Sequence, residues 1–269
     1  MKVSVIISTY NSPEWLEKVL WGYTCQIHKD FEIIVADDGS GKETLDLIRF
    51  FHEHSSLEIY HVWHEDKGYR RQMILNQAIL ASHTDYLIFT DGDCIPRNDF
   101  VLTHVTQAER GYFLSGGYCK LPIDISRVIA KENILNRESF ELAWLRAHGP
   151  VGASQSRKLF AKGRLADFLD FVTPARPTFN NCNSSAWKDD ILAVNGYDER
   201  MQYGGADREM GERLVNYGVL GKQIRHRAIV LHLDHSRGYR TNDSIEKNLG
   251  IRKETRDQKV SWTPHGIVK

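Results

Sequence analysis

The sequence predicts an α/β fold in which helices flank a mostly parallel sheet. Short apolar runs typical of buried strands recur through the first third of the chain, at 3–8, 31–36, 57–62 and 86–89. Stretches of helical length separate these runs, at 14–25, 43–54 and 70–81. Strands that alternate with helices of this length form right-handed βαβ units, because parallel neighbours need a long crossover.

The ends of these elements carry residues expected of caps and turns. Ser12 is a good N-cap and Pro13 a good first residue for the first helix. The second strand runs into the turn 37–41, which contains two glycines, and the fourth strand stops at Thr90. The last clear strand of the chain is the apolar run 228–231.

The alternation of strands and helices is lost after Asp93. Residues 126–148 carry apolar side chains that predict one long helix, and residues 149–165, rich in Gly, Ser, Lys and Arg, predict a mobile loop. Residues 179–187 are too polar for a core strand. Residues 237–269 have many charges and few apolar groups, so we expect a tail or lid that is ordered with substrate.

The composition is that of an ordinary globular protein. The 269 residues include 35 basic and 35 acidic ones, so the basic surface that nucleic-acid binding needs is not expected. The four cysteines form no C-x-x-C pair, which favours a reduced compartment without a zinc site or disulfide framework. The apolar runs are much shorter than the ~20 residues that span a bilayer, and the chain begins directly in a strand. We therefore expect a cytoplasmic protein without a signal peptide.

Three of the predicted strands end in polar loops, at 8–11, 37–40 and 91–93. The carboxyl ends of parallel strands share one edge, where open α/β sheets bind ligands, so we expect one site there. Asp91 and Asp93 are separated by one glycine, and two oxygen ligands in a tight turn suit Mg²⁺ or Mn²⁺. The alternative is a polar turn that only caps the next helix. Neither G-x-G-x-x-G nor G-x-x-x-x-G-K-[ST] is present, which argues against an NAD-type fold and a P-loop ATPase.

Further candidate ligands follow in the second half of the chain. Asp207 follows Gly204, Gly205 and Ala206 and lies in the first turn of a predicted helix. It either only stabilises the helix start, or lies where the glycines let a ligand approach the backbone. His232 and His235 follow the last strand, and a continued strand would place them on different sides. We therefore expect one metal ligand, with His232 as the first candidate and His235 as the second.

The segments 3–11, 31–40 and 91–93 together resemble the inverting glycosyltransferases of family 2, which have the GT-A fold. The resemblance covers roughly residues 1–110. Residues 195–207 resemble the C-terminal motif of β-1,4-galactosyltransferases and bacterial chondroitin-polymerase-type enzymes. That motif usually contains Gly-Gly-Glu-Asp, and here Ala206 replaces the glutamate that helps to bind the acceptor in those families.

The resemblance implies a Rossmann-like, mostly parallel GT-A sheet flanked by helices, with a C-terminal subregion on the acceptor side. It implies a donor-binding half at 1–110 and, in the same domain, an acceptor-binding and catalytic half at 111–236, followed by the tail or lid. The catalytic base would be Asp207, and the metal ligands would be Asp93 and His232, with His235 the second candidate. The donor-binding residues would be Ser8, Thr9, Tyr10, Asp37, Asp38, Arg70, Arg71 and Asp91. The acceptor-binding residues would be Asn183, Trp187, Gly205 and Ala206.

The function implied is metal-dependent, inverting transfer of a sugar from a UDP-sugar to a hydroxyl of a glycan. Tyr10 would lie against the uracil, and Arg70 or Arg71 would approach the nucleotide or its diphosphate. Mn²⁺ or Mg²⁺ would stabilise the diphosphate leaving group, and a carboxylate base would take the proton of the acceptor hydroxyl. The acceptor would be a lipid-linked glycan for a bacterial surface polysaccharide, O-antigen or capsule, built with peripheral contact to the inner face of the inner membrane.

Two alternatives remain at this stage. A non-catalytic module that binds a nucleotide sugar or a carbohydrate would need neither Asp207 nor a metal. A sugar nucleotidyltransferase would need a glycine-rich, basic loop after the first strand, and residues 8–11 are not such a loop. The sequence does not indicate the donor sugar, the acceptor, the linkage or the oligomeric state.

Overall fold

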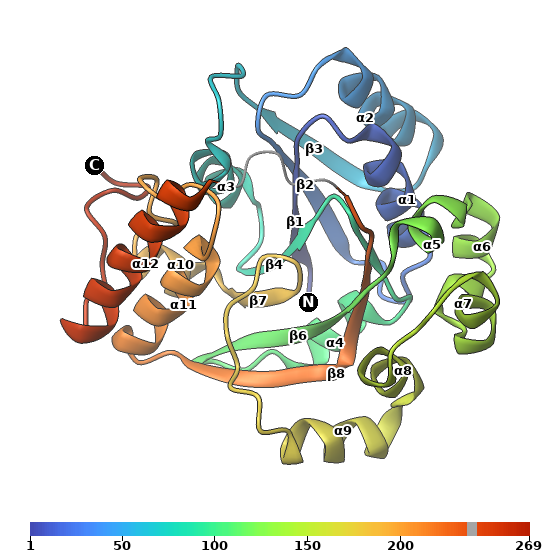
Figure 1. The fold of residues 1–269 in the computed structure, drawn as a ribbon. Helices are drawn as coiled ribbons and strands as arrows, with labels where there is room; N and C mark the ends of the chain where they lie inside the picture. Colours follow the sequence, from blue (N-terminus) through green and yellow to red (C-terminus); the bar gives the residue numbers. More distant parts are fainter. Residues whose placement is uncertain (236–240) are drawn as a thin grey trace.

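The computed structural model describes residues 1–235 and 241–269, and these residues form one mixed sheet in the order β3-β2-β1-β4-β7-β6-β8-β5 (Figure 1). The strands are β1 Val3–Thr9, β2 Phe31–Asp37, β3 Glu58–Trp63, β4 Tyr86–Asp91, β5 Cys94–Pro96, β6 Tyr112–Lys120, β7 Ser184–Trp187 and β8 Leu220–His232. The four strands β3, β2, β1 and β4 are parallel to one another, as the sequence predicts. The prediction of a mostly parallel α/β sheet is therefore confirmed for the N-terminal half.

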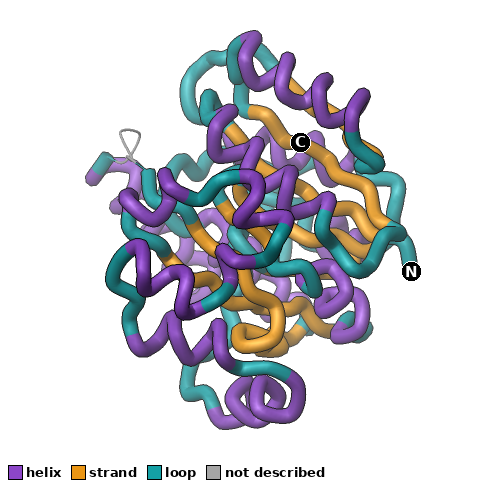
Figure 2. The backbone as a smooth tube through the Cα atoms, turned by 90° about the vertical axis from the view of Figure 1, so that its right-hand side faces the viewer, coloured by secondary structure: helices purple, strands orange, loops and turns teal. Residues whose placement is uncertain are grey.

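Helices cover both faces of the sheet (Figure 2). They are α1 Pro13–Thr24, α2 Lys42–His54, α3 Arg71–Ala81, α4 Phe100–Gln107, α5 Ile123–Val128, α6 Lys131–Leu135, α7 Leu142–His148, α8 Ala153–Phe160, α9 Gly163–Val172, α10 Lys188–Ala193, α11 Ala206–Tyr217 and α12 Asn242–Asp257, with a 3₁₀ helix η1 at Glu138–Phe140. Within the part of the chain that the structure describes, none of these helices combines the length and apolar character needed to cross a bilayer.

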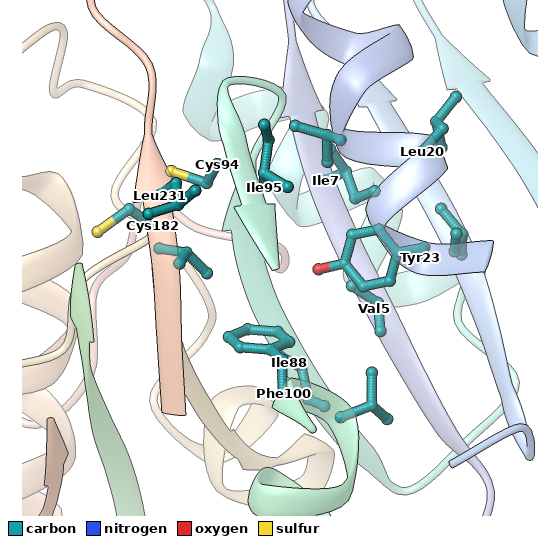
Figure 3. Packing of buried hydrophobic residues seen from close by; sticks show 14 of the residues in the cluster. Val5, Ile7, Leu20, Tyr23, Ile88, Cys94, Ile95, Phe100, Cys182 and Leu231 are labelled. Atoms are coloured by element: carbon teal, nitrogen blue, oxygen red, sulfur yellow. The ribbon is translucent and has the colours of Figure 1, made fainter. Parts of the chain in front are cut away.

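The alternation of side chains along β1 separates two hydrophobic cores. Val5 and Ile7 belong to a core that also contains Leu16 of α1 (Figure 3). Ile6 points to the other face and belongs to a core with Leu75 of α3. Each of these side chains is fully or almost fully buried, which stabilises the fold by about 1.5–3 kcal/mol per side chain. The strands that present the functional edge are thus fixed from both sides.

The register of the parallel strands brings three polar loops together. Thr9 of β1 is paired with Asp37 of β2, and Ser8 is paired with Asp91 of β4. The strand-end residues that the sequence singles out therefore lie side by side at one edge of the sheet.

The strand β7 is short and polar, yet it lies within the sheet. It pairs antiparallel with both β4 and β6, so the prediction that 179–187 cannot contribute a core strand is wrong. Its polar groups are satisfied internally: the hydroxyl of Ser185 lies 2.7 Å from the Tyr86 hydroxyl and 2.7 Å from Nδ1 of His104. A buried polar strand costs little when its groups have hydrogen-bond partners.

Asn183 completes this buried network. Its side-chain amide donates to the carbonyl oxygens of Gly117 (2.7 Å) and Ala228 (2.9 Å), which belong to β6 and β8. Its Oδ1 can then only accept, so Nε2 of His104, 3.0 Å away, carries the proton. Nδ1 of His104 therefore accepts from Ser185. Burial lowers the pKa of His104 to about 4, so the imidazole in this network is neutral.

The region after β6 differs from the predicted long helix at 126–148. The chain instead forms α5, α6, η1 and α7, because Ile129 is extended and Arg137 adopts a left-handed conformation with φ 68°. The loop predicted at 149–165 also contains α8 and the start of α9.

The predicted tail contains a well-packed helix. α12 packs against α11: Arg252 forms an ion pair with Glu212 (2.6 Å), and the hydroxyl of Thr255 donates to Glu209 (2.9 Å). The side-chain amide of Asn248 donates to three successive carbonyl oxygens at 202–204. Packing through polar side chains explains why a low apolar content misled the prediction. Residues 237–240 of the predicted tail lie outside the described residues.

Candidate functional site

The first part of the site is an ion pair at the ends of β1 and β4. The hydroxyl of Ser8 donates to Oδ1 of Asp91 (3.0 Å), and the guanidinium of Arg71 donates both to the Ser8 hydroxyl (2.8 Å) and to Asp91. Although burial alone would lower the pKa of Arg71, the Asp91 carboxylate raises it well above its usual value. The guanidinium of Arg71 therefore carries a positive charge at this edge.

The end of β2 carries two aspartates with different surroundings. Asp37 is buried and accepts from the backbone N–H of Ser40 (2.8 Å) and from Nε2 of His61 (2.9 Å), so it fixes the turn. Asp38 lies 2.7 Å from Nε2 of His64 and accepts from the backbone N–H of Arg70 (3.0 Å). Burial raises the pKa of Asp38.

The remaining predicted donor residues lie around this edge. The carbonyl oxygen of Thr9 accepts from the backbone N–H of Asp38 (3.1 Å). Tyr10 is 46% exposed, and its hydroxyl donates to Asp66 (2.8 Å), which leaves the ring at the surface of the edge. The guanidinium of Arg70 donates to the carbonyl oxygen of Glu65 and is therefore turned toward the loop before α3.

Asp93 and two histidines form a separate cluster beside β5. Oδ2 of Asp93 lies 2.9 Å from Nε2 of His235 and 3.8 Å from Nε2 of His232. Burial acts to raise the pKa of Asp93, but the hydrogen bond from His235 and the charge of His232 lower it overall. An imidazole nitrogen of each histidine thus approaches the same carboxylate oxygen, and carboxylate and imidazole are ligand types that suit a divalent transition metal.

Cys94 lies next to the carboxylate of this cluster. Its thiol is buried and donates to Oδ1 of Asp93 (3.3 Å). Burial and the neighbouring Cys182 raise the pKa of the Cys94 thiol well above its usual value. Ligand atoms of Asp93, Cys94 and His232 lie within 4.8 Å of one another, so Cys94 belongs to the group that could hold a metal ion.

Asp207 reaches the same site from the other half of the sheet. It lies in the first turn of α11, after Gly204 (φ 110°) and Gly205 (φ 84°), which adopt backbone conformations that other residues rarely take. Its Oδ2 accepts from the backbone N–H of Asn181 (3.2 Å). The charge of Asp207 also adds to that of Asp91 in raising the pKa of Arg71, which places it near the donor edge.

Two residues near Asp207 have structural roles. Glu209 is buried in an ion pair with Arg213 (2.8 Å), so it is not available to accept a proton from an acceptor. Tyr197 is buried and its hydroxyl donates to Asn181. Burial, followed by the charge of Asp207, raises the pKa of Tyr197, so its hydroxyl stays protonated.

Two of the residues predicted to contact the acceptor lie away from this site. Asn183 is fully buried in the hydrogen-bond network described above. Trp187 is paired with Tyr86 at the start of β4, the end opposite Asp91, and Arg110 stacks on its ring at 3.7 Å. Their positions give neither residue a contact with the functional edge. Gly205 and Ala206 lie directly beside Asp207 in the sequence and remain candidates.

His61 and His64 belong to the site but were not predicted from the sequence. His61 lies within β3, two residues before its end, and His64 directly follows this strand, which shares the functional edge with β1, β2 and β4. The signal was present, because polar residues that follow a parallel strand lie at the same edge as the other strand ends.

Comparison with known proteins agrees with this arrangement. Residues 4–121 match the family model described as "Glycosyl transferase family 2". The chain is 26% identical to the uncharacterized glycosyltransferase YfnE of Bacillus subtilis (strain 168), over 93% of this chain and 69% of that protein. It is 26% identical to the hyaluronan synthase of Pasteurella multocida, over 82% of this chain but only 24% of the synthase. It is 28% identical to the validoxylamine A glucosyltransferase of Streptomyces hygroscopicus subsp. jinggangensis (strain 5008), over 81% of this chain and 52% of that enzyme.

Solved structures share the fold at low sequence identity. GalNAc-T7 with UDP, GalNAc and Mn²⁺ superposes with a TM-score of 0.63 at 14% identity, over 94% of this chain and 48% of that one. The mannosyltransferase PcManGT from Pyrobaculum calidifontis, in complex with GDP-Man and Mn²⁺, superposes with a TM-score of 0.58 at 20% identity, over 88% and 58%. The chain has the GT-A fold, its residues 4–121 match the model of glycosyltransferase family 2, and it is similar in sequence to glycosyltransferases over most of its length.

Proposed function

We propose that the protein is a metal-dependent, inverting glycosyltransferase that moves a sugar from a UDP-sugar to a hydroxyl of a glycan acceptor. The observation that carries this proposal is the meeting of three groups: the ion pair of Asp91 and Arg71, the cluster around Asp93, and the carboxylate of Asp207. A single displacement on a sugar diphosphate needs a donor-binding edge, a metal site and a separate base.

We assign donor binding to residues 1–110 and acceptor binding and catalysis to residues 111–236. Tyr10 offers an exposed ring on which a base can stack, and Asp38 offers a carboxylate to the nucleoside. Arg71 holds a positive charge where the diphosphate would lie. Structures of similar fold contain UDP-GlcNAc in Staphylococcus aureus TarS, UDP in GalNAc-T7 and GDP-Man in PcManGT, which supports a nucleotide-sugar donor.

The residues around Asp93 fit a divalent metal, Mn²⁺ or Mg²⁺. A carboxylate oxygen and two imidazole nitrogens are an acceptable set for Mn²⁺, and imidazole is less suited to Mg²⁺. When bound, such an ion neutralises the charge that develops on the departing diphosphate. Asp93, His232 and His235 would hold it, and Asp91 would contact its waters or the ribose.

Asp207 takes the role of the base. Its carboxylate is kept in place by the N–H of Asn181, and it can accept the proton of the acceptor hydroxyl while the hydroxyl oxygen attacks the anomeric carbon. One displacement from the face opposite the diphosphate inverts that carbon. Gly204 and Gly205, in left-handed backbone conformations, set the start of the helix that carries this carboxylate.

We further propose a lipid-linked glycan for a bacterial surface polysaccharide as the acceptor, with the enzyme in the cytoplasm at the inner face of the inner membrane. The similarity to the hyaluronan synthase and the chondroitin synthase of Pasteurella multocida supports a polysaccharide role.

The deciding experiment measures UDP release from a panel of UDP-sugars, with and without Mn²⁺ and with simple glycoside acceptors. Asp207→Asn preserves the shape of the side chain and removes its basicity, so we expect kcat to fall by about 10²-fold or more with little change in donor affinity. Asp38→Ala is the matched variant, and it should weaken UDP binding instead. If Asp207→Asn keeps its kcat and loses UDP affinity, then the base lies elsewhere. UDP-sugar binding without turnover would favour a non-catalytic module.

A further inference from the structure

The outward face of α9 is apolar. Leu165, Phe168, Phe171 and Val172 are exposed, and Phe171 keeps 87% of its accessible surface. Spacings of three, four and seven residues place them on one face of the helix. Phe160, at the end of the preceding α8, is 73% exposed. Contiguous large apolar side chains at a protein surface mark an interaction site.

The opposite face of α9 attaches the helix to the protein through polar contacts. Asp170 is buried and accepts from the backbone N–H and from Nδ1 of His226 (2.8 and 2.9 Å) and from Nε of Arg227 (2.9 Å). Ala166, one turn earlier, is also buried. A surface helix normally turns its apolar face toward the protein core. The apolar face of α9 points outward instead, and the buried carboxylate of Asp170 fixes the helix in this orientation.

The charge around this apolar face is positive. Residues 142–178 contain six lysines and arginines but only two acidic residues, in a chain of zero net charge. Both acidic residues, Asp167 and Asp170, pair with Arg227 (3.2 and 2.9 Å). The basic residues next to the apolar side chains are therefore not neutralised by acidic residues of the same segment.

We propose that this surface docks on an anionic lipid bilayer. We call it the α9 face and define it by Phe160, Leu165, Phe168, Phe171, Val172 and the flanking Arg157, Lys162 and Arg164. The apolar side chains would enter the boundary between headgroups and acyl chains, and the basic ones would pair with lipid phosphates. A second copy of this chain fits less well, because a symmetric contact would place like charges opposite each other.

The α9 face is connected to the acceptor side of the site. Lys158 of α8 is buried, and its Nζ donates to the carbonyl oxygen of Tyr118 (2.7 Å). The ring of Tyr118 lies 6.0 Å from that of His232, in the proposed metal cluster. Docking at this face would bring a membrane-embedded acceptor near the site. This link to the acceptor rests on the proposed function, whereas vesicle binding does not.

The test is flotation of the full chain with vesicles, without any donor. Vesicles of phosphatidylglycerol and phosphatidylcholine are compared with pure phosphatidylcholine. We expect binding to the anionic vesicles, weakened by salt, and a loss of at least about tenfold in Phe168→Ser/Phe171→Ser. The matched control is Leu80→Ser/Leu249→Ser, which removes two exposed apolar side chains elsewhere and should change binding less than about twofold.

A charge-reversed pair tests the electrostatic part. Lys162→Glu/Arg164→Glu should lose about tenfold or more on anionic vesicles, whereas Lys42→Glu/Lys253→Glu, on α2 and α12, should not. Circular dichroism confirms that each variant is folded.

Several outcomes would overturn the inference. It fails if the unmodified chain does not float with anionic vesicles, or if Phe168→Ser/Phe171→Ser floats equally well. It also fails if the chain forms a dimer that this double variant dissociates while neither protein binds vesicles, which would make the face an interface between copies. UDP-sugar turnover without vesicle binding overturns this inference alone, and vesicle binding without turnover overturns only the proposed function.

Discussion

His232 and His235 both face the carboxylate of Asp93, although three positions separate them. The strand β8 ends at His232, so the chain no longer alternates and His235 returns to the same side. The two rings lie 6.1 Å apart and almost parallel, at 10°. The expectation that only one histidine could bind the metal assumed that the strand continued past His232. Because the strand ends there, we propose both histidines as metal ligands.

Removal of either histidine should weaken metal binding. We expect His232→Ala and His235→Ala each to raise the Mn²⁺ concentration for half-maximal UDP release by at least about tenfold. Even the loss of a residue that only hydrogen-bonds a metal ligand typically weakens metal affinity by about 10–100-fold. Asp93→Ala should abolish the response to Mn²⁺. His28→Ala, at the surface next to Asp30, is the control. Full activity in a metal chelator would contradict the assignment.

Asn183 should matter for stability and little for chemistry. Asn183→Ala leaves two buried carbonyl oxygens and Nε2 of His104 without partners. We expect the free energy of unfolding in urea to fall by about 2–4 kcal/mol, with donor affinity unchanged in the folded protein. Asn136→Ala, at an exposed position, should change it by less than about 0.5 kcal/mol. Loss of acceptor affinity at constant stability would instead restore the acceptor role.

At the scale of elements, α11 begins with two glycines in left-handed backbone conformations that position Asp207, the proposed base. Gly205 has φ 84°, and a Cβ there would lie 3.2 Å from the side chain of Arg252 on α12. The start of α11 is therefore set both by the glycine and by the helix that packs over it.

Gly205→Ala should disturb the base without touching the donor edge. We expect a loss of about 1–2 kcal/mol in the free energy of unfolding and a lower kcat, with little change in UDP affinity. Gly250→Ala is the matched control, because that glycine lies inside α12 with open space around it and its φ is not positive. It should stabilise the protein by up to about 1 kcal/mol. A Gly205→Ala protein with normal kcat would show that the helix start tolerates the change.

The elements that sequence reasoning found are those with a regular local pattern. The strands and helices up to residue 91 have the expected order, and their register brings Ser8, Asp37 and Asp91 together as predicted. The strand β7 was missed because its stability comes from His104 and Asn183, which are remote in sequence. The sequence did not predict the α9 face for the same reason. The residues that orient α9, His226 and Arg227, lie more than 50 residues away in the sequence.

At the scale of the whole molecule, the buried neutral histidine makes stability depend on pH. The folded pKa of His104 is about 4, below the ordinary value of about 6.5 in an unfolded chain. Below pH ~6.5 the unfolded chain therefore binds a proton that the folded protein does not, and stability falls as the pH drops toward 4.

Urea denaturation at pH 7 and pH 5 measures this effect. We expect the free energy of unfolding to be about 1–2 kcal/mol lower at pH 5 from His104 alone. Burial also lowers the pKa of His226, which acts in the same direction. His104→Gln should flatten the pH dependence, whereas His28→Gln should leave it unchanged. An equal slope in His104→Gln would show that other groups govern the acid sensitivity.

Because α12 packs on α11, the surroundings of Asp207 are completed only when the last part of the chain has been synthesised. A ribosome completes β1 to β4, and with them the donor edge, about 165 residues before it completes α12. During that interval the nascent chain has the residues for holding a nucleotide, but the helix that carries Asp207 lacks the partner that covers its start. A chain that ends before α12 would therefore contain the residues of the donor edge but would lack the contacts that cover the start of α11 and hold Asp207 in place.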